Sequence, residues 1–183
     1  MYNEFIPKLF FDKIVSEYLS PLLKSNGFTK GRGNNWTRTN GDIFSRITIQ
    51  KSKSRVEKEV SFRFYLHICP DGIQNTKVII DNKAMDWIFN EQSYAIEFED
   101  VLSKERKVFK FNNHGWLGWY VIFRENACDQ LLNDELKVDF ENYILPVVDK
   151  INTLDIYNNV KTKMNTYPKK DIHLGIYDFL FET

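Results

Sequence analysis

The chain has 183 residues, of which 43% are hydrophobic, 15% aromatic and 27% charged. This is the composition of an ordinary globular protein, and we predict a single globular domain over residues 1–183. Lysine and arginine together number 25, as do aspartate and glutamate, so the net charge is zero and no global field favours nucleic acid or membranes as partners.

The two cysteines, Cys69 and Cys128, form no CxxC pair, which indicates a reducing compartment and no disulfide framework. Residues 1–11 lack the basic and apolar regions of a signal peptide. No apolar run approaches the roughly 20 residues that a membrane span needs. We therefore expect a cytoplasmic protein that has no membrane partner.

The first predicted element is an amphipathic helix over residues 8–26, along which apolar side chains recur at helical spacing. Pro21 lies inside this pattern. Either Ser20 caps a new helical turn with Pro21 at its first position, or the helix kinks there. Gly27 follows, where a glycine can close the helix in the left-handed conformation at little steric cost.

Residues 28–68 are predicted to form three strands or slightly more. The tripeptide Asn-Gly-Asp at 40–42 is a strong hairpin signal, because both turn positions tolerate positive φ. Apolar and polar side chains alternate over residues 43–50 and again over residues 60–68, which indicates strands with one buried face. The Lys/Ser-rich run 51–58 between them is predicted to be a solvated loop.

Residues 71–92 give mixed signals. A short strand at 78–80 and one or two helical turns at 84–89 are the expected elements. Residues 94–99 alternate as a strand does, whereas residues 106–111 alternate only weakly.

The apolar run 116–123 predicts a strand in the middle of a sheet or covered on both faces. From Asp134 the period is helical again, and apolar side chains as far as Leu154 fall on one face, with Pro146 interrupting the pattern. For residues 171–183 both a strand and a short helix remain open. The order of helix, strands and helices predicts an α+β fold: an antiparallel β-sheet with an N-terminal helix and C-terminal helices packed mainly on one face.

Charge is polarised along the chain although it sums to zero. Residues 24–58 hold nine basic and two acidic residues, net +7, whereas residues 81–105 hold two basic and seven acidic residues, net −5. Strand periodicity also gathers Arg, Tyr and Trp on sheet faces, and these residue types dominate binding hot spots. An uncovered sheet face that is merely hydrated would show the same polar pattern. The predicted binding surface comprises Trp36, Arg38, Arg46, Gln50, Arg63, Tyr65 and His67.

These features favour a non-enzymatic protein that binds a protein partner through this surface, with neutralisation of a toxin as one form of that function. If so, replacing Arg38, Arg46 and Arg63 with alanine should weaken capture of the partner and leave stability nearly unchanged. The alternative is nucleic-acid binding through the basic segment 24–58, with Trp36 or Tyr65 stacking on bases.

A third alternative is an enzyme with a pocket over the open sheet face that uses His67, His114 or Cys128, but no motif of high specificity supports it. His67 and Cys69 share a strand face, and two ligands do not make a zinc site. No base adjoins Cys128 to lower the pKa of its thiol. The Gly-Arg-Gly turn at 31–33 precedes a strand rather than a helix, which disfavours a phosphate cradle. We assign no catalytic residue, no metal and no cofactor.

The succession of motifs from residue 22 onward resembles a bacterial family, domain of unknown function 4304. Its pattern is a helix ending in a Leu-rich Gly-Phe, a Lys/Gly turn, an aromatic-x-Arg strand, a Gln-Lys-Ser strand end and a Phe-rich strand. The matching residues are Leu22, Gly27, Phe28, Lys30, Gly33, Trp36, Arg38, Gln50, Lys51, Ser52 and Phe62. A Trp-rich strand at 116–119 and an Ile-Leu-Pro at 144–146 also fit. The resemblance implies a fold and a bacterial origin but no activity; some members resemble immunity partners of secreted toxins.

Overall fold

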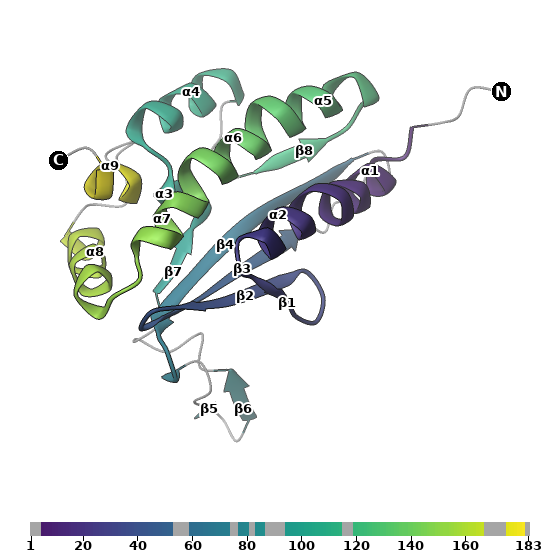
Figure 1. Ribbon diagram of the computed structural model, residues 1–183. Coiled ribbons are helices and arrows are strands. Elements are labelled where there is room, and N and C mark those ends of the chain that lie inside the picture. The colour runs from purple at the N-terminus through teal and green to yellow at the C-terminus, as the bar shows by residue number, and fades with distance from the viewer. Residues whose placement is uncertain are drawn as a thin grey trace.

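The structure is a computed structural model, and it describes residues 5–52, 59–73, 77–80, 83–86, 94–114, 119–166 and 175–181. A twisted antiparallel sheet lies behind a layer of helices in Figure 1, and these helices are packed over one of its faces. This arrangement confirms the α+β fold predicted from the order of helical and strand patterns.

The N-terminal helix consists of α1 (Pro7–Lys13), a π-helical segment η1 (Ile14–Leu19) and α2 (Ser20–Ser25). The predicted helix is therefore confirmed. Ser20 Oγ has no hydrogen-bond partner and the backbone of Ser20 is itself helical, with φ −64° and ψ −44°, so Pro21 does not start a separate helix. Instead the wider π turn ends at Leu19, two residues before the proline, which has no N–H to donate to the preceding turn.

The main sheet has the strand order β1-β2-β3-β4-β7, and β8 also pairs with β4. Its strands are β1 (Thr29–Lys30), β2 (Asn35–Asn40), β3 (Ile43–Lys51), β4 (Val60–Pro70), β7 (Tyr94–Glu97) and β8 (Tyr120–Ile122). All pairings are antiparallel. The strands predicted within residues 28–68 are thus confirmed. The strand predicted over residues 94–99 is confirmed for residues 94–97 only, because the helix α3 (Phe98–Val101) begins directly after it.

For residues 116–123 the predicted strand is confirmed over Tyr120–Ile122, but of its two expected positions, in the middle of a sheet or covered on both faces, the first is wrong for the described residues. β8 pairs with residues 60–62 of β4, and β7 pairs with residues 65–68 along the same strand. The 11-residue β4 is long enough for two short strands to share one edge, so β8 lies at the border of the sheet.

The prediction of helical turns at 84–89 is wrong for its described part, because residues 83–86 form a strand. β5 (Lys77–Ile80) and β6 (Lys83–Asp86) pair as a separate two-stranded ribbon. The helical signal there covered only one or two turns, which is too short to stabilise a helix in isolation. Residues 87–89 of that prediction lie outside the described part of the chain, as do residues 171–174 of the C-terminal segment.

The second half of the chain supplies the remaining helices. They are α3 (Phe98–Val101), α4 (Lys104–His114), the 3₁₀ turn η4 (Glu125–Ala127), the continuous helix formed by α5 (Cys128–Gln130), η5 (Leu131–Leu136), α6 (Lys137–Asp139), η6 (Phe140–Ile144) and α7 (Leu145–Lys150), then α8 (Leu154–Thr166) and α9 (Ile176–Phe181). The long helix therefore starts before Asp134 and ends at Lys150. The weakly alternating residues 106–111 lie in α4.

The core lies between the sheet and these helices. Phe64 on β4 is 1% exposed, and its ring centroid lies 4.9 Å from the centroids of Phe98 and Phe140. Directly paired residues of antiparallel strands share a face, so the alternating buried residues of β3 and β4 all point toward the helices. The opposite face of the sheet carries the polar half of each strand.

Candidate functional site

Strand register divides the seven predicted binding residues between the two faces of the sheet. Arg46 is paired with His67, and Gln50 with Arg63, while Tyr65 lies between them on β4. These five residues therefore share the face opposite the helices, which we call the open face. Four of them are half-buried and Gln50 is exposed.

Trp36 does not belong to this surface, contrary to the sequence-based prediction. It is paired with Ile47 on β3, which places it on the face that the helices cover. Its side chain is only 1% exposed. Trp36 is therefore a core residue and is not available to stack on a base or to contact a large partner.

Arg38 lies on the same covered face, where it holds structural elements together. Its Nη1 donates to the Asn26 carbonyl oxygen at 2.8 Å, and its Nη2 lies 2.7 Å from Asp149 Oδ1. The guanidinium also lies over the Phe28 ring, 4.7 Å from its centroid. Arg38 thus links the end of α2 to the end of α7, which is a structural role.

Arg63 is the cation of the open face that lies between two aromatic rings. Its guanidinium carbon lies 4.6 Å from the Tyr65 ring centroid and 4.9 Å from that of Trp119. Gln50 Oε1 accepts hydrogen bonds from Arg63 Nε at 2.9 Å and from the Tyr65 hydroxyl at 3.0 Å. Trp119, which directly precedes β8, is a member of this group that the sequence-based surface omitted.

Arg46 and His67 form the second polar pair of the open face. Burial, and next the charge of Arg46, lower the pKa of His67 to about 4. His67 Nδ1 and Arg46 Nε are both buried without a hydrogen-bond partner. His67 is consequently neutral at physiological pH, and Arg46 is the charged member of this pair.

A hollow of about 380 Å³ lies at the β4–β8 border of the open face. The residues that line it are Ser52, Glu59, Ser61, Trp119 and Val121. Ser61 Oγ donates to Glu59 Oε1 at 2.6 Å. Because Trp119 lines the hollow and also stacks on Arg63, the hollow and the polar strip form one continuous surface.

The histidine and the cysteine considered for catalysis lie apart. His67 is on the open face, whereas Cys128 is 5% exposed and packs in the core on the helix side. Burial, and next the charge of Asp129, raise the pKa of the Cys128 thiol to about 11, so the reactive thiolate is scarce at neutral pH. The side chain of His114 lies outside the described residues.

A buried charge network joins α4 to the long helix and to β8. Asp139, 0% exposed, accepts hydrogen bonds from Arg106 Nε at 2.7 Å, Lys110 Nζ at 2.6 Å and the Tyr120 hydroxyl at 2.6 Å. Lys110 Nζ also lies 3.5 Å from Glu135 Oε2. Burial, and next the charge of Asp139, raise the pKa of Tyr120 well above its ordinary value. Tyr120 therefore remains a hydrogen-bond donor to the carboxylate.

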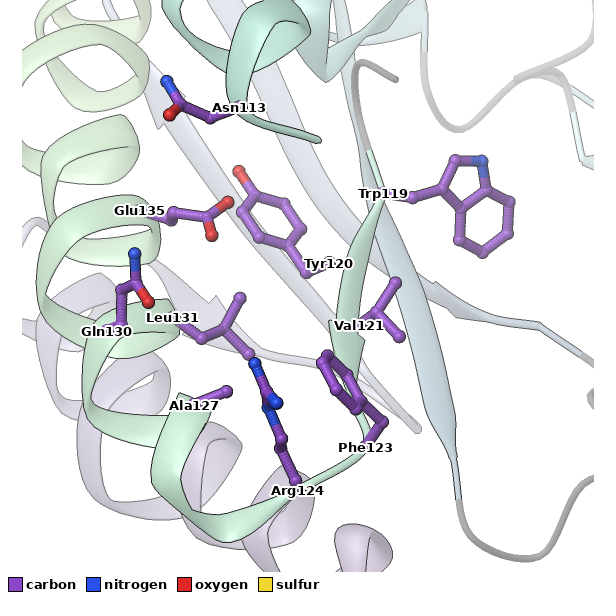
Figure 2. A pocket seen from close by; sticks show the side chains of 10 residues that line it. All are labelled: Asn113, Trp119, Tyr120, Val121, Phe123, Arg124, Ala127, Gln130, Leu131 and Glu135. Atoms are coloured by element: carbon purple, nitrogen blue, oxygen red, sulfur yellow. The ribbon is translucent and has the colours of Figure 1, made fainter. Parts of the chain in front are cut away.

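A pocket of about 330 Å³ adjoins this network. Figure 2 shows Glu135 and Tyr120 facing each other at one end of it, and Arg124 extending toward Leu131 at the other. The acidic and basic groups of the network outside the pocket already pair with each other. The network is thus a cross-link between three elements, with the pocket beside it.

Metal sites and membrane-spanning helices are both absent from the described residues. That part of the chain contains no group of three or more His, Cys, Asp or Glu side chains that could hold a metal ion. It also contains no helix that is long and apolar enough to cross a membrane.

Comparison with known proteins identifies the family and nothing more specific. No curated protein and no solved structure matches the chain significantly. The family described as Domain of unknown function (DUF4304) matches residues 19–150, a segment that begins in the N-terminal helix and ends with α7. It includes both the open face and the buried charge network. The chain belongs to this family of unknown function, DUF4304.

Proposed function

We propose that this protein is a non-enzymatic cytoplasmic domain that binds a partner protein with an acidic surface through the open face of its sheet. The observation that carries the proposal is the fixed position of Arg63 between Tyr65 and Trp119. Arginine, tyrosine and tryptophan are the residues that contribute most to binding energy at protein interfaces.

The fixed geometry of Arg63 favours binding because little conformational entropy remains to be lost. The two rings hold the plane of its guanidinium, and Gln50 binds its Nε. A guanidinium has five N–H donors, and Nε is the atom of Arg63 for which an acceptor is found within the described residues. The terminal nitrogens are thus free to bind a partner carboxylate in the bidentate geometry that arginine prefers.

The charge of the open face supports an acidic partner. Arg46 and Arg63 have no carboxylate within 4.0 Å in the described ranges of the chain. By contrast, Arg38 and Arg106 on the helix side each pair with an aspartate. An acidic surface on the partner would neutralise this excess positive charge and accelerate encounter.

Neutralisation of a secreted bacterial toxin would be one instance of this function. What supports it is the resemblance of some family members to immunity proteins, together with the open face described above. An immunity protein would be expected to bind its toxin stoichiometrically and to require no chemistry of its own.

The test compares affinity capture by wild type and two double variants from lysate of the source organism. Arg46→Ala/Arg63→Ala removes both cations of the open face, and Lys8→Ala/Lys13→Ala removes the same charge from exposed positions on α1. Native mass spectrometry and quantitative proteomics identify what is bound. We expect one protein that wild type and the α1 variant retain equally and that the open-face variant binds at least tenfold more weakly.

The melting temperature serves as the control, and it should differ by less than about 3 °C between the three proteins, since the replaced side chains lie on the open face or at exposed positions on α1, outside the core between sheet and helices. Equal capture by all three proteins would refute the open face as the binding site. Nucleic acid bound in place of protein, and released by nuclease, would refute the proposal in favour of nucleic-acid binding.

A further inference from the structure

A separate pocket of about 370 Å³ lies at the other side of the molecule, between α2 and the β1–β2 pair. The residues that line it are Ser20, Lys24, Phe28, Thr29, Lys30 and Trp36. Two are basic and none is acidic. Because Trp36 points to the covered side of the sheet, this pocket is distinct from the open face.

The two lysines of the pocket carry uncompensated charge. Lys24 and Lys30 are exposed, and within the part of the chain that the structure describes neither lies within 4.0 Å of a carboxylate. The lysines on the preceding turns of the same helix, Lys8 and Lys13, each have an aspartate or glutamate partner at 3.8 Å. The pocket is therefore a local concentration of positive charge on a protein of zero net charge.

Two buried polar atoms in the pocket lining also lack partners. Trp36 Nε1 and Ser20 Oγ are inaccessible to solvent and have no hydrogen-bond partner. Buried donors without an acceptor are rare in native proteins, and each one suggests an ion or ligand that completes the site. This observation is independent of the lysines, and a ligand with oxygen acceptors would satisfy both donors once the lining side chains shift to admit it.

The remaining lining is aromatic. Phe28 is 3% exposed and Trp36 1%, and Lys30 Nζ lies 5.6 Å from the centroid of the Trp36 ring. From these features we infer that the pocket binds a small organic phosphate. Its phosphate group would lie between Lys24 and Lys30, and its apolar part in the mouth of the pocket, against the small exposed areas of Phe28 and Trp36. Two ammonium groups match a dianion better than the single charge of a carboxylate.

Nuclear magnetic resonance titration of ¹⁵N-labelled protein with phenyl phosphate tests this inference, because the indole N–H of Trp36 is a reporter inside the site. Trp36→Phe assigns that signal among the four tryptophans. We expect a saturable shift of the Trp36 indole signal. Lys24→Gln/Lys30→Gln should weaken binding at least tenfold. The control Lys8→Gln/Lys13→Gln makes the same change in net charge, on the helix that also carries Lys24, and should alter the affinity less than twofold.

Benzoate provides the comparison for the anionic group, since it has the same ring and a single carboxylate. Equal affinity for benzoate and phenyl phosphate would overturn the assignment to phosphate. Equal weakening by both double variants, or a Trp36 signal that does not shift, would overturn the site itself. The indole signals of the other tryptophans, unchanged by the substitutions, verify that the variants remain folded.

Discussion

Replacement of Asp139 by asparagine should strongly destabilise the protein although the two side chains have the same shape. The carboxylate is 0% exposed and accepts three hydrogen bonds, from Arg106, Lys110 and Tyr120. Asparagine keeps the shape but removes the charge and turns an N–H₂ group toward one of the donors. Two buried cations are then left with one acidic partner, Glu135, 3.5 Å from Lys110.

The magnitude follows from the cost of breaking a buried ion pair by removing one partner, about 3–5 kcal/mol. For a domain of this size each kcal/mol lowers the melting temperature by about 2–4 °C, so Asp139→Asn should lower it by about 6–20 °C. Urea denaturation at pH 7 measures the free energy directly. The double variant Lys110→Met/Asp139→Asn also removes one of the two buried cations that lose their counter-charge. Its loss of unfolding free energy should therefore be smaller than the sum of the losses in the two single variants by about 1–3 kcal/mol.

Asp12→Asn is the matched control, because Asp12 makes an exposed ion pair with Lys8 at 3.8 Å. Such a surface pair contributes less than about 1 kcal/mol. A loss below about 1 kcal/mol for Asp139→Asn as well would contradict the reasoning. It would mean that Arg106 and Lys110 are solvated well enough in the folded protein to need no buried counter-charge.

Three further predictions follow from burial, backbone conformation and ionisation. Trp36→Ala should lower the free energy of unfolding, measured by urea denaturation, by about 3–5 kcal/mol. Trp119→Ala on the open face should lower it by less than half as much, and equal losses would contradict the placement of Trp36 in the core. Gly41 has φ of 59°, and a Cβ added there would meet the Asn152 carbonyl oxygen, so Gly41→Ala should lower the free energy of unfolding by at least about 2 kcal/mol. Gly33 has φ of 71° but more space around it, so Gly33→Ala should lower it by about 1 kcal/mol. His67 is neutral in the folded state down to a pKa of about 4, so its unfolded form alone gains a proton as pH falls below 6.5. Stability should therefore fall between pH 6.5 and 4, by at most about 3 kcal/mol from this group, and His67→Gln should show a smaller fall.

The alternation of β3 and β4 could be predicted from the sequence because a strand has a strict period of two. Most apolar residues of these strands are buried and most polar ones face the other side, as the pattern indicates, with Ser45 buried and Phe44 on the open face as exceptions. The hairpin turn could be predicted too, since Gly41 adopts the positive φ that the turn requires. Both signals involve residues that are close in sequence, and for this reason most of the sheet could be predicted.

The position of Trp36 on the covered face could also have been predicted from the sequence, by counting the strand register from the hairpin turn. The two-residue turn pairs Asn40 with Ile43, and counting back along the strands then pairs Trp36 with Ile47. Residues paired in this way share a face, so Trp36 had to lie with the apolar residues of β3. The same count pairs Arg38 with Ser45 and so places it on the covered face as well. Its partner Asp149, by contrast, lies on a helix far along the chain, and no local pattern indicates that contact.

The orientation of α4 contradicts its hydrophobicity and could not be predicted from it. This helix buries Arg106 and Lys110, 7% and 1% exposed, and exposes Val108, Phe109 and Phe111 at 40%, 45% and 46%. An amphipathic helix normally does the opposite. Its orientation must therefore be determined by interactions that hydrophobicity does not describe.

Charge supplies those interactions. Glu135 and Asp139 are four residues apart, so they lie on one side of the long helix, and both are buried. Arg106 and Lys110 have the same spacing on α4 and provide the matching cations. A buried carboxylate without a cation costs more than an exposed apolar side chain, so the ion pairs determine which side of α4 faces inward. Removing the charge of Asp139 would weaken this constraint, and α4 should then be the first helix whose amides lose protection from hydrogen exchange.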